Sequence, residues 1–221
     1  MNRKLKIETG WTYLKGTAHM TIGAAAGAAV AVTLQTETAA SLFLVGLGLV
    51  SGLIPDLDID GKLSNKITIS HTFFRKITQF IGLLLIIYSY FKGLDPEKWY
   101  GIGAGTTVII IASFIKQRTM LTITGIAVLI GGFFLKENWL GLLGIYIIFA
   151  SFVAHRSYTH SVIGLIFFSI IAFQLEASLK LEGVFTACVL GYISHLVADM
   201  KFLPFNKRGV KLFLPFSTKE F

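Results

Sequence analysis

Long apolar runs, separated by short polar connections, follow one another along the whole chain. Eight such runs are present, at 16–34, 39–54, 76–91, 100–115, 119–135, 139–154, 161–175 and 183–199. A helix needs about 20 apolar residues to cross a bilayer comfortably, and several of these runs are somewhat shorter. The pattern predicts an all-α fold, a polytopic integral membrane bundle of about eight transmembrane helices.

Nothing in the sequence divides this bundle into parts. We find no fixed-period repeat, linker or low-complexity tract, and therefore predict one membrane-embedded helical domain over 1–221. A polar segment at 1–15 precedes the first run, and a tail at 200–221 follows the last. Within the runs, the pairs Gly23/Gly27 and Gly48/Gly52 have GxxxG spacing, which is typical of close helix contacts in lipid.

The composition agrees with a membrane protein. Of the 221 residues, 54% are hydrophobic and only 14% are charged, against about 25% in an ordinary soluble domain. The net charge of +8 could indicate a nucleic-acid partner, but the basic residues lie in the connections between runs, so we expect no nucleic acid. The single cysteine, Cys188, excludes an internal disulfide and a thiolate metal cluster.

The basic residues also predict how the chain is oriented. If the N-terminus is cytoplasmic and eight runs cross the membrane, only four of the 20 Lys and Arg residues fall in outer connections. These four are Lys92, Lys98, Lys136 and Lys180. Because Lys and Arg are enriched in cytoplasmic loops, we predict that both termini are cytoplasmic.

The unusual polar residues fall at that same cytoplasmic face. His19 starts the first run, and Asp56 and Asp58 follow the second, which Pro55 ends. The sixth and seventh runs are joined by a segment that carries two histidines and an arginine, and the eighth ends in a histidine and an aspartate spaced i, i+4 on one helix face. These residues are His155, Arg156, His160, His195 and Asp199. Histidine and aspartate are ordinary ligands of zinc and related metals, so the sequence predicts a metal site at this face.

Each residue taken alone has a simpler interpretation. A single histidine such as His19 can be structural, Asp56 and Asp58 can cap or solvate a loop, and Arg156 can anchor the cytoplasmic side of a helix. The segment 56–61 also has the alternating oxygens and glycine that begin an EF-hand loop. However, its twelfth position is Ile67 rather than glutamate, which argues against calcium.

Several motifs resemble one known family. They are Thr17-Ala18-His19, the segment 52–58 (GLIPDLD), the segment 155–161 (HRSYTHS), the segment 191–199 (GYISHLVAD) and the tail segment 208–217 (RGVKLFLPFS). In their order and spacing they are similar to the YdjM-like family of multi-pass bacterial inner-membrane proteins, described as metal-dependent hydrolases. The chain departs from the family pattern at Ile59-Asp60, where His-Pro is frequent.

The resemblance implies a chemistry. The family is distantly similar to zinc-dependent phospholipase C and single-strand nucleases, which implies His19, Asp56, Asp58, His160, His195 and Asp199 as metal ligands here. The metal would be zinc, with manganese or magnesium as alternatives.

We expect hydrolysis of a phosphoester in a membrane lipid or lipid-linked substrate. His155 or one of the aspartates would be the general base, and Arg156, with Lys207 or Arg208 from the tail, would neutralise the phosphate. Two other classes remain open, a membrane adaptor without chemistry and a transporter that uses the same cluster. A transporter would need polar groups near the bilayer midplane, where the runs are nearly free of them.

Overall fold

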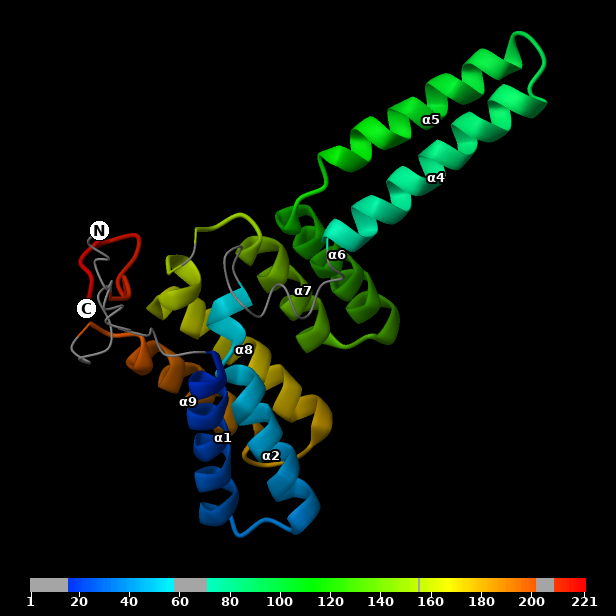
Figure 1. The fold of residues 1–221 in the computed structure, drawn as a ribbon. Coiled ribbons are helices and arrows are strands. Elements are labelled where there is room, and N and C mark those ends of the chain that lie inside the picture. The colour runs from blue at the N-terminus through cyan, green and yellow to red at the C-terminus, as the bar shows by residue number, and fades with distance from the viewer. Residues whose placement is uncertain (1–15, 58–70, 155, 202–208) are drawn as a thin grey trace, which may run out of the picture. The chain divides into compact units, whose positions relative to one another are not determined.

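The computed structural model describes residues 16–57, 71–154, 156–201 and 209–221. Within these residues every regular element is helical (Figure 1). The eight α-helices are α1 (Gly16–Thr33), α2 (Thr38–Ser51), α4 (His71–Lys92), α5 (Glu97–Ser113), α6 (Gln117–Leu135), α7 (Asn138–Ala150), α8 (Val162–Leu179) and α9 (Val184–Ala198). Two short 3-10 turns, η1 (Ile54–Leu57) and η2 (Tyr158–His160), lie before and after the middle of the chain. The predicted all-helical fold is thus confirmed.

Each predicted run corresponds to one α-helix, although the ends differ. Helix α4 begins at His71 rather than at 76, because polar residues in its first turns continue the helix ahead of the apolar run. Helix α7 ends at Ala150 rather than at 154, because residues 151–153 form a turn and a bend.

In the part of the chain that the structure describes, three helices contain segments that are long and apolar enough to cross a membrane. The segments are Thr72–Lys92, Arg118–Leu135 and Val162–Leu179, whereas α1, α2, α7 and α9 are apolar but shorter. Eight crossings, and the cytoplasmic placement of both termini, therefore stay predictions.

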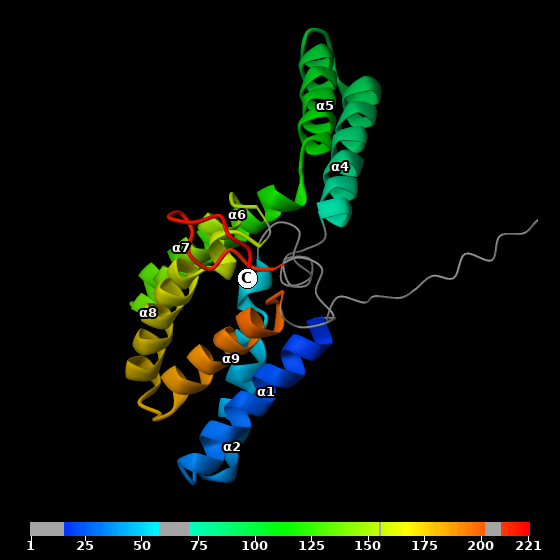
Figure 2. The ribbon, with the colours of Figure 1, turned by 90° about the vertical axis from the view of Figure 1, so that its left-hand side faces the viewer.

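The chain divides into two compact units, Met1–Pro55 with Arg156–Phe221, and Asp56–His155. A single domain over 1–221 stays a prediction. The first unit contains α1, α2, α8 and α9, in which α1, α2 and α9 contact one another and α8 packs against α9 (Figures 1 and 2).

Glycines allow the three helices α1, α2 and α9 to touch. A Cβ atom added at Gly23 would lie 2.4 Å from the carbonyl oxygen of Gly48, and one added at Gly191 would lie 2.5 Å from the same oxygen. Only a residue without a side chain permits backbones to approach this closely. The predicted role of the GxxxG pairs in helix contacts is confirmed, and the contact draws the ends of α1, α2 and α9 together.

The second unit consists of two helical hairpins, α4–α5 and α6–α7. In the first hairpin Gly82 and Gly105 face each other, and the Gln79 side chain donates a hydrogen bond to Ser113 Oγ at 3.0 Å. Large apolar side chains point outward, among them Ile111 at 62% and Phe133 at 80% exposure. Such surfaces are unfavourable in water and are suited to lipid.

Candidate metal centre

His195 and Asp199 form the base of the site at the C-terminal end of α9. His195 is in the last turn of the helix and Asp199 is its C-cap residue. The i, i+4 spacing places both side chains on one face, with His195 Nε2 3.7 Å from Asp199 Oδ2. Both are buried, at 0% and 4% exposure. A buried carboxylate requires charge or hydrogen-bond compensation, which the neighbouring side chains supply.

Gly52 fixes the tautomer of His195. The His195 Nδ1 atom lies 2.7 Å from the Gly52 carbonyl oxygen. Because a carbonyl oxygen only accepts hydrogen bonds, Nδ1 carries the proton. In the neutral ring, Nε2 then presents its lone pair toward Asp199. This is the arrangement by which a second partner orients a histidine ligand.

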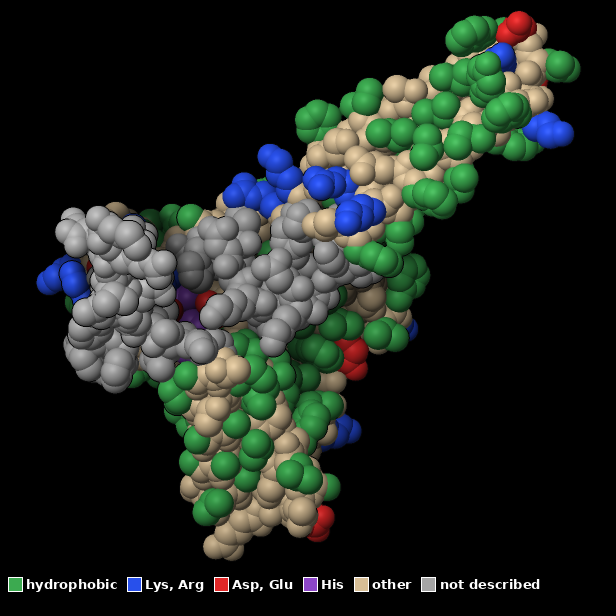
Figure 3. All heavy atoms as spheres, viewed as in Figure 1, with side chains coloured by type: hydrophobic (Ala, Val, Ile, Leu, Met, Phe, Trp, Pro, Cys, Tyr) green, Lys and Arg blue, Asp and Glu red, His purple; other side chains and the backbone are tan. Residues whose placement is uncertain are grey.

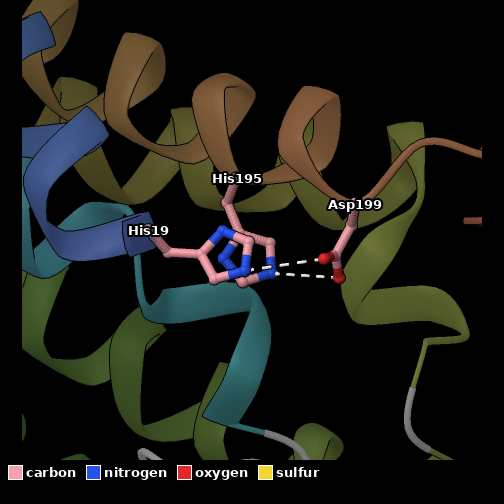
Figure 4. A group of neighbouring side chains, drawn as sticks. All are labelled: His19, His195 and Asp199. Atoms are coloured by element: carbon pink, nitrogen blue, oxygen red, sulfur yellow. Dashed lines mark ion pairs between the residues drawn. The ribbon is translucent and has the colours of Figure 1, made fainter. Parts of the chain in front are cut away.

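His19 enters the site from α1. It is 3% exposed, its Nε2 lies 3.5 Å from Asp199 Oδ1, and its ring stacks on that of His195 with centroids 4.1 Å apart (Figure 4). The approach depends on Gly52, since a Cβ atom there would lie 2.7 Å from the His19 carbonyl oxygen.

His160 enters from η2, between α7 and α8. It is fully buried, and its Nε2 lies 3.2 Å from His195 Nε2 and 3.6 Å from Asp199 Oδ2. On the other side of the ring, Nδ1 lies 3.1 Å from Thr159 Oγ1. The buried Tyr192 hydroxyl donates to the Thr159 carbonyl oxygen, so α9 holds the short η2 turn in place.

Arg156 contributes a cation to the same carboxylate. Its Nη2 atom is 3.3 Å from Asp199 Oδ2, and its side chain is 16% exposed. The backbone at Arg156 is left-handed, with φ of 59°. For a residue with a side chain this conformation costs roughly 1–2 kcal/mol, which the surrounding contacts must offset.

Of the three remaining predicted site residues, the structure describes only Asp56. Asp56 lies in η1 and is largely buried, at 9% exposure, in the turn that Pro55 starts. It is the first residue of the second unit. Asp58 and His155 lie outside the described residues.

The described side chains fit a metal ion by chemistry and by spacing. Imidazole nitrogens with a carboxylate oxygen are a usual donor set for zinc. Ligands about 2.0–2.1 Å from a tetrahedral zinc lie about 3.3–3.5 Å from one another. The Nε2 atoms of His160 and His195 lie 3.2 Å apart, and the three Nε2 atoms lie 3.5 to 3.7 Å from an oxygen of Asp199. In particular, His19, His195 and Asp199 offer ligand atoms that all lie within 4.8 Å of one another.

A family model described as YdjM inner membrane protein matches residues 14–221. The chain belongs to this family. No curated protein and no solved structure matches it. As a member of the YdjM family, with three helices able to cross a bilayer, the protein is embedded in the inner membrane.

Sequence reasoning missed three contributors to the site of this YdjM family member. Gly52 was identified only as a packing glycine, and Thr159 and Tyr192 only as parts of motifs. The spacing carries a partial signal for one of them, because Tyr192 precedes His195 by three residues and therefore lies on the same side of α9. A backbone carbonyl acceptor such as that of Gly52 has no signal in the sequence.

Proposed function

We propose that this protein is a metal-dependent hydrolase that acts on a phosphoester at the cytoplasmic face of the inner membrane. One observation carries the proposal. Three buried histidines, from α1, η2 and α9, converge on the buried carboxylate of Asp199 at the separations that ligands of one metal have. Burial of so many ionisable groups is costly unless they bind something or neutralise one another.

His19, His160, His195 and Asp199 would hold the metal. Asp56 is a further candidate ligand because it follows Gly52 by only four residues, and the Gly52 carbonyl oxygen already binds His195. Zinc suits these donors best, and manganese is the alternative. When bound, the metal supplies Lewis acidity and lowers the pKa of a coordinated water.

Arg156 is suited to bind the substrate phosphate. A guanidinium group presents planar, paired N–H donors that match phosphate oxygens. Its Nη2 atom stands 3.3 Å from Asp199 Oδ2, so a phosphate bound by this guanidinium group would lie beside the proposed metal ligands. His155, the preceding residue, is the candidate general base.

A lipid or lipid-linked phosphoester fits the location best. The segregation of Lys and Arg favours a cytoplasmic position for the start of α1, the end of α2, the α7–α8 connection and the end of α9. A site at this level would meet the phosphate groups of lipids that already lie in the plane of the inner leaflet.

Hydrolysis of a generic diester tests the proposal. We expect detergent-purified protein supplied with zinc or manganese to hydrolyse bis(p-nitrophenyl) phosphate, and expect Asp199→Asn to abolish the activity. Glu176→Gln is a matched control, because the Glu176 carboxylate accepts a hydrogen bond from Phe185 N at 2.8 Å, a bond that an amide oxygen can replace. Metal binding without hydrolysis of this diester or of phospholipids would favour an ion transporter. Absence of both metal and hydrolysis would favour an adaptor.

A further inference from the structure

Four basic residues lie at the N-terminal ends of α4 and α6. Arg75 and Lys76 follow the first turn of α4, Lys116 is the N-cap residue of α6, and Arg118 is the second residue of that helix. Neither helix has an acidic residue in its first turn. The ion pairs found among the described residues involve none of the four. Because helix N-termini are themselves partly positive, the described residues at these two helix starts carry an excess of positive charge that an anion would relieve.

The four cations are brought together by the fold of the second unit. The hydrogen bond from Gln79 to Ser113 holds the start of α4 beside the end of α5, and Lys116 follows only three residues later. Lys and Arg side chains accordingly gather at the base of the α4–α5 hairpin (Figure 3). Lys76, Lys116 and Arg118 are exposed there.

An apolar cavity of about 530 Å³ begins at residues that are close to these cations in the sequence. The lining at this end includes Phe74, which is next to Arg75 in α4, and Met120, which is two residues after Arg118 in α6. The lining continues along one face of α6 through Ile123 and Ala127 to Gly131, a length of about 16 Å at 1.5 Å per residue.

The cavity offers little to a polar occupant. The hydroxyl of Thr124, which belongs to the lining, already donates to the Met120 carbonyl oxygen at 2.9 Å. Small residues at 127 and 131 leave the space open, and a Cβ atom added at Gly131 would meet nothing within 4 Å. This apolar cavity, which forms a groove along α6, suits a hydrocarbon chain.

We propose that this region is a binding site for an anionic phospholipid of the cytoplasmic leaflet. One acyl chain lies along α6 in the groove, and the headgroup phosphate lies on the basic cluster of Arg75, Lys76, Lys116 and Arg118. Basic pockets between membrane helices are a recurring way to bind anionic lipid headgroups. The site uses none of the His and Asp residues of the candidate metal centre and does not depend on hydrolase activity.

Native mass spectrometry of the full chain in detergent micelles tests the site. Micelles doped with dioleoyl phosphatidylglycerol are compared with micelles doped with dioleoyl phosphatidylcholine. We expect retained phosphatidylglycerol in excess of phosphatidylcholine, with weaker retention at high ionic strength. Each Lys or Arg near an anionic lipid headgroup contributes about fivefold in affinity, so Lys116→Gln with Arg118→Gln should weaken phosphatidylglycerol binding roughly 25-fold.

Two further variants separate the headgroup from the acyl chain. Gly131→Leu fills the groove and should lower retention of both lipids, whereas Gly103→Leu on α5, where an added Cβ also meets nothing within 4 Å, should lower neither. Lys136→Gln with Lys180→Gln serves as the charge control, because it removes two cations at the C-terminal ends of α6 and α8. Equal binding of the two lipids, or equal loss in the control variants, would overturn the proposal. Displacement of the lipid by soluble glycerol phosphate at matched concentration would also overturn it, because it would indicate a site for free phosphate.

Discussion

His195 Nδ1 lies 2.7 Å from the carbonyl oxygen of Gly52, a contact that joins the end of α9 to the end of α2 across 143 residues of sequence. The glycine also admits the backbone of His19, since any side chain at 52 would begin 2.7 Å from the His19 carbonyl oxygen. One residue therefore orients one histidine and makes room for another.

Gly52→Ala should weaken metal binding. The added methyl group forces α1 and α2 apart, which moves His19 and the carbonyl partner of His195. Losing such an orienting contact lowers metal affinity by about 10- to 100-fold. The measurement is a competitive zinc titration against a chromophoric chelator. Gly46→Ala is the matched control in α2, because a Cβ atom there meets nothing within 4 Å. Equal affinities in the two variants would contradict the role given to Gly52.

The Thr159 hydroxyl should act as an orienting partner of His160. It lies 3.1 Å from His160 Nδ1, and both residues are buried. Thr159→Val keeps the shape but removes the hydroxyl, so we expect roughly a tenfold loss of zinc affinity. Thr159→Ser retains the hydroxyl and should keep most of the zinc affinity. If the serine variant binds zinc as weakly as the valine variant, the hydroxyl is not the group that matters.

Removal of the Arg156 side-chain charge should separate catalysis from metal binding. We expect Arg156→Gln to keep its metal and to lose about 10²–10³-fold in kcat/KM, since it removes the donor that we propose to bind the substrate phosphate, where negative charge would develop. Arg156→Lys keeps the positive charge but lacks the paired N–H donors of a guanidinium group. Its kcat/KM should therefore lie between those of the native protein and of Arg156→Gln. The readouts are metal content and diester hydrolysis on the same samples. Loss of metal from Arg156→Gln would show that the arginine instead supports the ligand Asp199.

The orientation of the chain can be tested across α6. Lys116 precedes this helix and Lys136 follows it, and both side chains are exposed. In a Cys188→Ala background, we expect Lys136→Cys to react with a membrane-impermeant maleimide from the periplasm of intact cells. Lys116→Cys should react only after the membrane is opened. The opposite pattern would place the candidate metal centre on the outer side and remove the argument for a substrate in the inner leaflet.

The helical fold was largely predictable because a helix that lies in lipid needs a long run of apolar residues. Each predicted apolar run corresponds to one helix, and the errors are at the ends, where polar residues such as His71 still fit the first turn of α4. The spacing of His195 and Asp199 likewise predicts their shared face.

The contacts within the site were predictable only in part. His160 and His195 are 35 residues apart in sequence, so a common level in the membrane could be inferred from the pattern of charge but not a separation of 3.2 Å. The contact from His195 to the Gly52 carbonyl and the link from Tyr192 to Thr159 join residues that are 143 and 33 positions apart, so no local pattern identifies these partners.

Metal content tests the central claim most directly. Full-length protein, purified in detergent without chelators, should contain one or two equivalents of zinc or manganese by inductively coupled plasma mass spectrometry. His195→Ala should lose that metal, while Glu176→Gln, which alters a carboxylate elsewhere in the first unit, should retain it. Absence of metal from the native protein, even after reconstitution with zinc and manganese, would contradict the account.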